Sequence, residues 1–483
     1  MVRLSRWPTP ELLVIGDKAY DPAVMYIASA SFLEGLLPYR DFTFLHPPGA
    51  LFGFAPSVLF GAAFGDAVGM ASARLAVVLL GVVNTGLVVL LLRRYGFLAV
   101  LVGGGLYAGW SPMAYTEQRP LLEPFLATAL LVALHLLRSK HRWAPLWMGA
   151  ILGVATMVKL WAAVDLIAFA VLLLKLRRFA DLWRFILGAF LGGSAVALPF
   201  FLAAPGPMWE MVVTAQLGRP DQGVGLLTRA TMFGPVPGFS HSVYRAGMGL
   251  LMAALLGVAL LLVIRGWRGR AESAEAVEAG AWASIAILHA VIMSLSSSFY
   301  DHYAMFVAVP LTLVVGAAVG WVNGRVHLER RAFTALAIAA VLLVASVTVA
   351  ASLYKAVRTD TDRMSAAERV RIAEWADGLG CTWASVTDRV LIDEVVDALR
   401  SGCTMSVDPF GDGLLAHARG GDRRAAAIAA EERHLAQADG LVLPIDETQW
   451  PFTARTGYEI RTDFVAGEVV GTRVLWERSG NAG

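Results

Sequence analysis

The sequence has little charge for its length. Only 16% of its 483 residues are Asp, Glu, Lys or Arg, whereas 57% are hydrophobic. A soluble domain has roughly 25% charged and 45–50% apolar residues. These values exclude an ordinary soluble protein and predict an all-α polytopic membrane protein.

Several familiar motifs are also absent. The sequence contains no P-loop, no Gly-x-Gly-x-x-Gly segment, no internal repeat and no low-complexity tract, so a nucleotide-binding domain is not expected. It has no His-x-x-x-His or comparable spacing, and we predict neither a metal nor another cofactor. The net charge of +2 does not indicate nucleic acid binding, because in a membrane protein the placement of Lys and Arg matters more than their sum.

Cysteine is scarce as well. The two cysteines, Cys381 and Cys403, lie in the polar C-terminal region. Neither has the close second Cys or His that a zinc site needs. If this region lies outside the cell, a disulfide between them is the natural interpretation; two free buried thiols are the alternative.

Long apolar runs fill the middle of the chain. A spanning helix needs roughly 20 predominantly apolar residues, and about ten runs are candidates. Residues 50–64 are too short for a span, and we expect a partly embedded helix there. The candidate spans fall at residues 70–92, 96–114, 122–137, 144–159, 161–176, 186–204, 246–264, 280–298, 304–322 and 332–353.

Basic residues gather in every second loop between these runs. Because Lys and Arg favour cytoplasmic loops, the remaining loops are predicted to be outside, together with residues 15–49 and everything after residue 353. This orientation implies a multi-pass protein of the cytoplasmic membrane. The N-terminal tail would then lie outside with no helix to carry it there, so a further spanning helix is expected ahead of residue 21.

The sequence changes character after residue 353. Charged residues and Gly become frequent, helical patterns occur at 365–379 and 422–437, and strand-like runs occur at 440–444 and 468–476. We therefore predict a transmembrane domain over residues 1–353 and a small extracytoplasmic α/β domain over residues 354–483.

The segment before the first long apolar run carries the most specific pattern. It contains Asp21, then Gly35, a Pro-Tyr-Arg-Asp-Phe turn at 38–42, and a Pro-Pro pair at 47–48. In order and spacing it resembles the first outer loop of the GT-C superfamily of integral-membrane glycosyltransferases, in the branch with protein O-mannosyltransferases and the lipid A aminoarabinose transferase. The resemblance covers residues 15–320 and implies a GT-C-like transmembrane bundle.

The resemblance also implies roles for particular residues. Asp21 would be the general base, and Glu123 would bind the acceptor or orient Asp21. Cations at Lys159, Arg219 or His46 could pair with the lipid phosphate, because positive groups offset charge on a leaving oxygen. The residues with implied substrate-binding roles are Arg40, Asp41, His46, Lys159, Arg219, Tyr300, Asp301, His302 and Tyr303.

Each assignment has a structural alternative. Asp21 followed by Pro is a good helix start, and Glu123 could serve a helix N-terminus. Lys159 could extend to the membrane interface, and residues 300–303 could form an interfacial aromatic belt. Asp17 is a rival general base, and Glu117 is a rival acid in the second outer loop.

The sequence thus predicts a glycosyltransferase that moves a hexose or pentose from a polyprenyl-phosphate donor to a lipid, glycan or protein acceptor. The donor, the acceptor and membrane lipids would be its partners. One alternative is a transporter or lipid flippase, which would place charges within its spans; Asp165 is the lone candidate. Another is a membrane scaffold that binds through its outer domain without catalysis.

Overall fold

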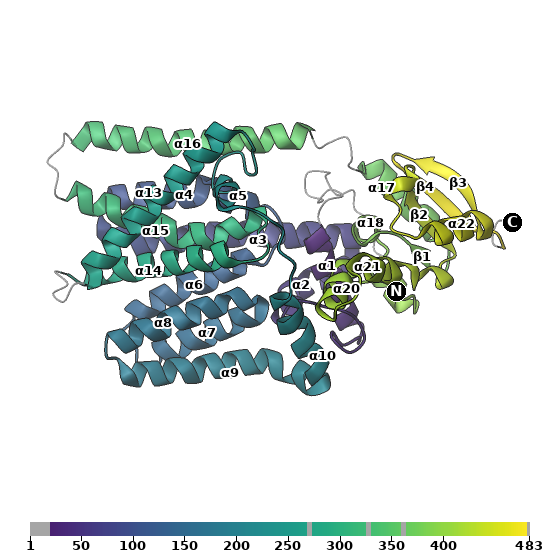
Figure 1. Ribbon diagram of the computed structural model, residues 1–483, viewed down its shortest axis with the longest axis horizontal. Coiled ribbons are helices and arrows are strands. Elements are labelled where there is room, and N and C mark those ends of the chain that lie inside the picture. The colour runs from purple at the N-terminus through teal and green to yellow at the C-terminus, as the bar shows by residue number, and fades with distance from the viewer. Residues whose placement is uncertain (1–19, 268–272, 325–329, 359–363, 481–483) are drawn as a thin grey trace. The chain divides into compact units, whose positions relative to one another are not determined.

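The computed structural model describes residues 20–267, 273–324, 330–358 and 364–480 (Figure 1). The chain divides into two compact units, which are described separately. Unit 1 combines residues 1–76, 197–219 and 359–483, and unit 2 combines residues 77–196 and 220–358. Unit 1 thus gathers three segments that are far apart in the sequence.

Unit 2 is a bundle of helices (Figure 1). Two helices cross the boundary between the units: α3 (Asp66–Leu92) begins in unit 1, and α9 (Phe179–Ala203) ends there. The others are α4 (Phe97–Gly109), α5 (Ser111–Thr116), α6 (Glu123–Arg138), α7 (Ala144–Val158), α8 (Ala163–Lys175), α12 (Leu226–Thr231), α13 (Ser242–Trp267), α14 (Ala274–Leu295), α15 (Ala304–Asn323) and α16 (Arg330–Arg358).

Every predicted apolar run contains a helix, but only six helical segments of the described chain are long and apolar enough to cross a membrane. Some of the other predicted runs form shorter helices. For example, the 15 residues of α7 extend about 22 Å, less than the roughly 30 Å hydrocarbon core. The six segments are Asp66–Tyr95, Phe97–Thr116, Phe179–Ala203, Ser242–Trp267, Ala274–Leu295 and Asp301–Asn323.

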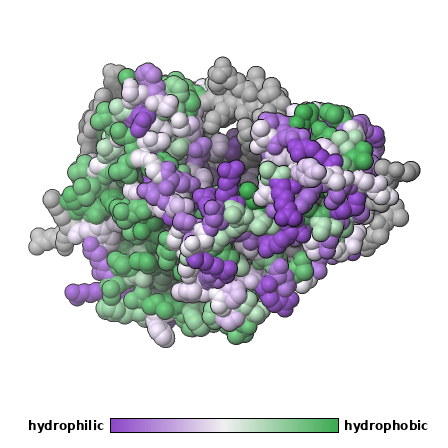
Figure 2. Space-filling view, turned by 45° about the vertical axis from the view of Figure 1, so that its right-hand side comes forward, coloured by the Kyte–Doolittle hydropathy of each residue, from purple (hydrophilic) through white to green (hydrophobic). Residues whose placement is uncertain are grey.

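The six segments differ in how far they are enclosed by protein. The segment containing α15 is 67% buried across its apolar window, whereas α13 is only 11% buried. Side chains such as Leu250 and Leu261 on α13 are exposed, and Figure 2 shows broad hydrophobic surfaces over the long helices. A helix that exposes apolar side chains along its length is suited to lipid contact. The chain is a multi-pass membrane protein.

Glycine permits close helix contact between α7 and α9. A Cβ atom on Gly149 would lie 1.9 Å from the carbonyl oxygen of Phe185, and one on Gly188 would lie 2.0 Å from that of Leu146. Small residues allow membrane helices to approach in this way. These two positions therefore fix how the two helices pack within unit 2.

Unit 1 contains the N-terminal helices and the polar C-terminal region. Its helices are α1 (Tyr20–Leu33), α2 (Gly49–Phe64), α10 (Pro205–Trp209), α11 (Ala215–Leu217), α17 (Ala366–Ala376), α18 (Val386–Leu391), α19 (Val396–Arg400), α20 (Pro409–Ala418), α21 (Arg423–Glu432) and α22 (Ala454–Asp463). The helix α2 lies where the sequence predicts a short embedded helix, and α17 begins with a capping box formed by Ser365 and Glu368.

A four-stranded sheet lies in the C-terminal region of unit 1, with strand order β1-β2-β4-β3. Its strands are β1 (Thr382–Trp383), β2 (Gly440–Pro444), β3 (Phe464–Val470) and β4 (Arg473–Arg478). The single strand predicted at 468–476 is wrong, because the chain turns there. Gly471 has a φ of +58°, which lets β3 and β4 pair as an antiparallel hairpin.

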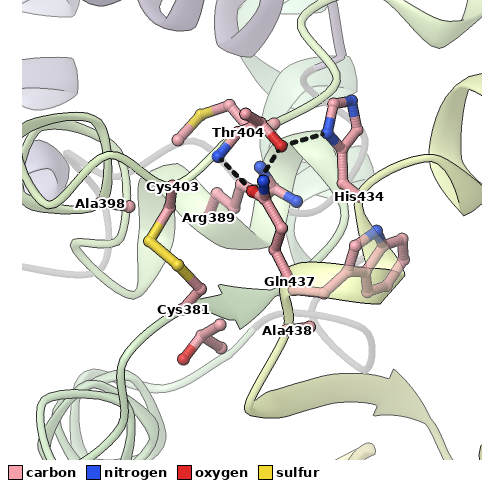
Figure 3. A pocket seen from close by; sticks show the side chains of 11 residues that line it. Cys381, Arg389, Ala398, Cys403, Thr404, His434, Gln437 and Ala438 are labelled. Atoms are coloured by element: carbon pink, nitrogen blue, oxygen red, sulfur yellow. Dashed lines mark hydrogen bonds between the residues drawn. A yellow bond between two sulfur atoms is a disulfide. The ribbon is translucent and has the colours of Figure 1, made fainter.

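Cys381 and Cys403 form a disulfide in this region. Figure 3 shows the bond beside a small polar pocket. There the Thr404 backbone N–H and hydroxyl both bond to Oε1 of Gln437, and the hydroxyl also lies 2.8 Å from Nδ1 of His434. The disulfide ties the segment after α19 to the residue before β1, and the hydrogen bonds tie the same segment to the one before β2.

The C-terminal region is also tied to the N-terminal helices within unit 1. The Tyr26 hydroxyl donates to Oδ1 of Asp66 at 3.1 Å. Oδ2 of Asp66 accepts from the backbone N–H of Val395 at 2.9 Å, and the N–H of Ala67 donates to Oδ1 of Asp393 at 2.9 Å. The start of α3 and the segment before α19 therefore hold each other through buried carboxylates.

Candidate active site

Asp21 lies in the first turn of α1 and is exposed. The residues that follow it, from Pro22 to Ser31, are all buried. The helix is therefore anchored by its body while its first turn faces solvent. Asp17, the rival base, lies outside the described residues, as do residues 15–19 of the predicted loop.

The residue next to Asp21 is held by the C-terminal region. The Tyr20 hydroxyl donates to Oδ1 of Asp408 at 2.9 Å and accepts from the backbone N–H of Phe410 at 3.0 Å. The Tyr20 and Phe410 rings meet edge to face, with centroids 6.3 Å apart. The same Asp408 oxygen accepts from the N–H of Gly411 at 2.8 Å and so caps α20.

Several carboxylates surround this contact. Burial, together with the negative charges of Asp412 and Asp21, raises the pKa of Asp408 to about 6. Asp412 accepts from the Thr43 hydroxyl at 2.7 Å and lies 3.6 Å from the Arg433 guanidinium. Asp21 is thus part of an acidic region to which the first loop and α20 both contribute.

The Pro-Tyr-Arg-Asp-Phe segment forms a compact turn. Tyr39 has a φ of 70° and donates its hydroxyl to the carbonyl of His46 at 2.7 Å. The Arg40 guanidinium bonds to both carboxylate oxygens of Asp41 at 2.8 Å, which lowers the pKa of Asp41. Asp41 also accepts from the N–H of Leu37 at 2.7 Å. Arg40 and Asp41 therefore pair with each other at the surface.

Two further predicted phosphate ligands lie in unit 1. The His46 ring is half-buried and packs against Phe44, with centroids 5.7 Å apart. Arg219 is also half-buried, and its Nε atom is buried without a hydrogen-bond partner among the described residues. A buried guanidinium N–H in this state retains the capacity to bind an anion.

Unit 2 contains a second group of predicted residues, centred on a buried ion pair. The Lys159 Nζ lies 2.5 Å from Oε1 of Glu123, and these residues are 9% and 2% exposed. His302 Nε2 lies 3.7 Å from the same oxygen. Lys159 therefore does not reach an exposed interface; it is held by a carboxylate.

Aromatic rings complete the surroundings of Lys159. Its Nζ lies 4.4 Å from the ring centroid of Trp161 and 4.6 Å from that of Tyr303, distances suited to cation–π attraction. Tyr300 stacks on His302 and accepts a hydrogen bond from Gln222 at 2.7 Å. The loop at 300–303 is thus packed around the ion pair and is more than an aromatic belt.

A small cavity separates Glu123 from a second buried polar pair. Glu123, Asp165 and Phe306 line this cavity among apolar residues, and Oε2 of Glu123 has no hydrogen-bond partner among the described residues. Asp165 Oδ1 lies 2.8 Å from Nε2 of His289, whose Nδ1 lies 2.8 Å from the carbonyl oxygen of Phe306. Asp165, the acid that the sequence singles out for the transport alternative, is therefore paired with His289.

The structure sorts the predicted residues into two sets. Unit 1 holds Asp21, Arg40, Asp41, His46 and Arg219, and unit 2 holds Glu123, Lys159, Tyr300, Asp301, His302 and Tyr303. Within unit 2, contacts join Glu123, Lys159 and His302 directly. Glu117 accepts hydrogen bonds from Tyr107 and Asn84 at 2.8 and 3.3 Å, away from this ion pair.

Sequence reasoning missed four residues of these groups, namely Tyr20, Asp408, Trp161 and His289. The Asp-Pro step at 408–409 is a recognisable helix start, but it does not reveal the partner of its carboxylate. Within the described residues, no group of three or more His, Cys, Asp or Glu side chains could hold a metal ion.

Comparison with known proteins supports the fold. No protein-family model matches the sequence, and the search of curated proteins gives no match. Among solved structures, the chain is similar to apo ArnT from Cupriavidus metallidurans, with 16% identity and a TM-score of 0.52. The match covers 96% of this chain and 94% of that chain.

A second similar structure is the apo oligosaccharyltransferase from Archaeoglobus fulgidus. Its identity is 13% and its TM-score is 0.50, and the match covers 90% of this chain but 66% of the longer relative. At these identities the similarity concerns the fold. The predicted GT-C-like bundle with a small C-terminal α/β region is confirmed.

Proposed function

We propose that the chain is a membrane glycosyltransferase that transfers a sugar from a polyprenyl-phosphate donor to a lipid, glycan or protein acceptor, with Asp21 as general base. The observation that carries this proposal is an exposed carboxylate on the first turn of a firmly anchored helix, in a chain with a GT-C-like fold. The site would face the outer side of the cytoplasmic membrane, together with the C-terminal region.

The chemistry needs a base and a means of stabilising the leaving group. Asp21 would take the proton of an acceptor hydroxyl while that oxygen forms a bond to the anomeric carbon. The bond between this carbon and the phosphate oxygen would break, and its electron pair would leave with the polyprenyl phosphate. An exposed carboxylate can reach an incoming hydroxyl, which is the first requirement for a general base.

The leaving phosphate would need a cation. Arg219 suits this role because its buried Nε atom lacks a partner among the described residues, and Arg40 and His46 are further candidates on the first loop. Lys159 is different, since its charge is already balanced by Glu123. We therefore assign Arg219 the leading donor-phosphate role. The Glu123–Lys159 pair and His302 stay predicted substrate-binding residues of unit 2.

The experiment is an assay of donor cleavage by the full chain in lipid. Release of polyprenyl phosphate is measured from mannose, arabinose, glucose and galactose carriers. Asp21→Asn is compared with Asp422→Asn, which alters another exposed acid at a helix start. The proposal expects one carrier to be consumed, with activity lost only in Asp21→Asn. Equal activity in both variants, or no cleavage by folded protein, would contradict it.

One observation favours transport as a second candidate. Asp165 on α8 and His289 on α14 form a fully buried pair, and ionisable groups among membrane helices often serve ion or proton pathways. Proteoliposomes loaded with a pH-sensitive dye would test this. Proton flux that is lost in Asp165→Asn, with no donor cleavage, would favour transport over glycosyl transfer.

A further inference from the structure

We infer that the C-terminal region takes part in the active site through Asp408, which positions the first turn of α1 by binding Tyr20. This inference rests on the proposed role of Asp21. It assigns the C-terminal region a task in catalysis, beyond stability or acceptor binding, and it makes Asp408 and Tyr20 positioning residues that act through Asp21.

The geometry carries the inference. Asp21 follows Tyr20 directly, so restraining the Tyr20 ring restrains the helix turn from which the Asp21 side chain projects. Tyr20 has three contacts with the segment 408–410: its hydroxyl donates to Asp408, accepts from the N–H of Phe410, and its ring packs on the Phe410 ring. Asp408 is itself fixed as the N-cap of α20.

A second hydrogen bond, from Thr43, restricts rotation about the contact between Tyr20 and Asp408. The Thr43 hydroxyl donates to Asp412, one helical turn after Asp408 on α20, at 2.7 Å. The segment 408–412 therefore binds the chain at two points, the first residue of α1 and the residue after the turn at 38–42. Preorganisation of this kind matters because a displacement of about 1 Å can reduce the rate on the order of 100-fold.

Other titratable groups also lie close to Asp408. The groups facing Asp408 are Tyr20 and Asp21 on α1, together with Asp412 on α20. Asp412 in turn lies near Arg433, which follows α21. Asp408→Asn removes the carboxylate charge but keeps the accepting oxygen, so it tests whether the hydrogen bond or the charge holds Tyr20.

Two substitutions separate position from charge. Tyr20→Phe removes both hydrogen bonds of the hydroxyl but keeps the ring and the Asp408 charge. We expect a fall in kcat of about tenfold with KM nearly unchanged, because substrate contacts remain while the base is misplaced. Asp408→Asn keeps an oxygen that can accept from Tyr20 and Gly411. We expect kcat within about threefold of wild type, because both hydrogen bonds to this oxygen can remain.

Matched controls are available in unit 1. Asp422→Asn changes the N-cap of α21, and Tyr458→Phe changes an exposed tyrosine of α22; neither should alter kcat. Hydrogen exchange of residues 20–26 gives a readout besides activity. It should rise in Tyr20→Phe and stay unchanged in the controls.

The outcomes distinguish the positioning role of Tyr20 and Asp408 from the proposed function. If Asp21→Asn is inactive but Tyr20→Phe has wild-type kcat, the positioning role is overturned and the proposed function stands. If Asp21→Asn retains activity, the proposed function fails and the inference fails with it. A fall in kcat for Tyr20→Phe with faster exchange only around residues 20–26 is the result expected.

Discussion

The two acids that the sequence predicts for the active site, Asp21 in unit 1 and Glu123 in unit 2, occupy opposite environments. Asp21 is exposed, and its helix turn is held by hydrogen bonds to a neighbouring residue. Glu123 is 2% exposed and shares a short contact with Lys159. The contrast indicates different tasks: an exposed carboxylate can exchange a proton with an incoming hydroxyl, whereas a buried carboxylate paired with an ammonium group is bound to stay charged.

The two environments also differ in how they respond to substitution. A buried pair depends on both partners, because either charge alone is costly away from water. The hydrogen bonds around Tyr20 involve a neutral hydroxyl, and losing one costs less. Stability measurements should therefore report mainly on the pair in unit 2, and activity measurements mainly on the first loop in unit 1.

The largest loss of stability is expected from Lys159→Met. Glu123 would keep a buried charge without a partner, which costs about 3–5 kcal/mol. The measurement is thermal unfolding of the protein in lipid nanodiscs at neutral pH. Asp21→Asn, in contrast, should unfold at the wild-type temperature because Asp21 is exposed.

Two further variants serve as controls for that result. The double variant Lys159→Met/Glu123→Leu should recover most of the lost stability, since no unpaired charge remains. Arg455→Met removes an exposed ion pair with Glu459 and should have little effect. Equal destabilisation by the single and double variants would show that packing, rather than charge, explains the loss.

The next largest effect is expected in the C-terminal region. The disulfide closes a loop with a sequence separation of 22 residues, and replacing both Cys381 and Cys403 by Ser should destabilise unit 1 by about 3 kcal/mol. Wild type treated with reducing agent should behave in the same way. Local unfolding is best followed by hydrogen exchange of residues 382–408. Unchanged exchange there would mean that other contacts suffice to hold the region.

Hydropathy predicted much of this fold. Each long apolar run contains a helix because a membrane helix must satisfy its backbone internally and present apolar side chains. The lengths of the helices were harder to predict. The helices α6, α7 and α8 have only 16, 15 and 13 residues, and few polar residues separate them in the sequence. The hairpin at β3 and β4 was missed because Gly471 was treated as part of a strand.

The site was predictable only where the chemistry is local. A charged residue beside an apolar run is visible in the sequence, and the resemblance to the GT-C superfamily singles out Glu123 and Lys159 among such residues. Their contact is not visible, and neither is the contact between Tyr20 and Asp408, which are 388 residues apart. His289 illustrates the same limit, because one histidine in an apolar helix does not indicate that Asp165 is its partner.

A smaller effect should appear in the pH dependence of unit 1. Burial raises the pKa of Glu431 to about 7, above its unfolded value of 4.5. The folded state therefore binds more protons, so this stability is complete below pH 4.5 and is lost as pH rises through 7. The pKa of His434 is lowered to about 4 by burial and by neighbouring Arg389. This shift makes stability rise with pH, but only below about pH 6.5.

Stability should consequently fall by about 1 kcal/mol between pH 6 and pH 8. Glu431→Gln should flatten this dependence, whereas Glu432→Gln, which alters the less buried neighbour, should preserve it. Chemical denaturation at several pH values, followed by hydrogen exchange in the C-terminal region, provides the measurement. A rise in stability over this range would mean that Glu431 is ionised in the folded state well below pH 7.

The smallest effect on stability is expected for substitution of Arg40, because its ion pair in unit 1 is exposed, unlike the buried pair of unit 2. The Arg40–Asp41 pair is exposed, with side-chain exposures of 54% and 26%, and exposed pairs contribute little to folding. Arg40→Ala should therefore leave the unfolding temperature unchanged. Asp41→Ala should lower it slightly, since Asp41 also accepts the N–H of Leu37.

If Arg40 turns from Asp41 to a donor phosphate, Arg40→Ala should raise KM for the donor severalfold without changing stability. Arg371→Ala removes another exposed ion pair of unit 1 and should leave KM unchanged. An unchanged KM would limit Arg40 to its pair with Asp41 and leave Arg219 as the cation for the leaving phosphate.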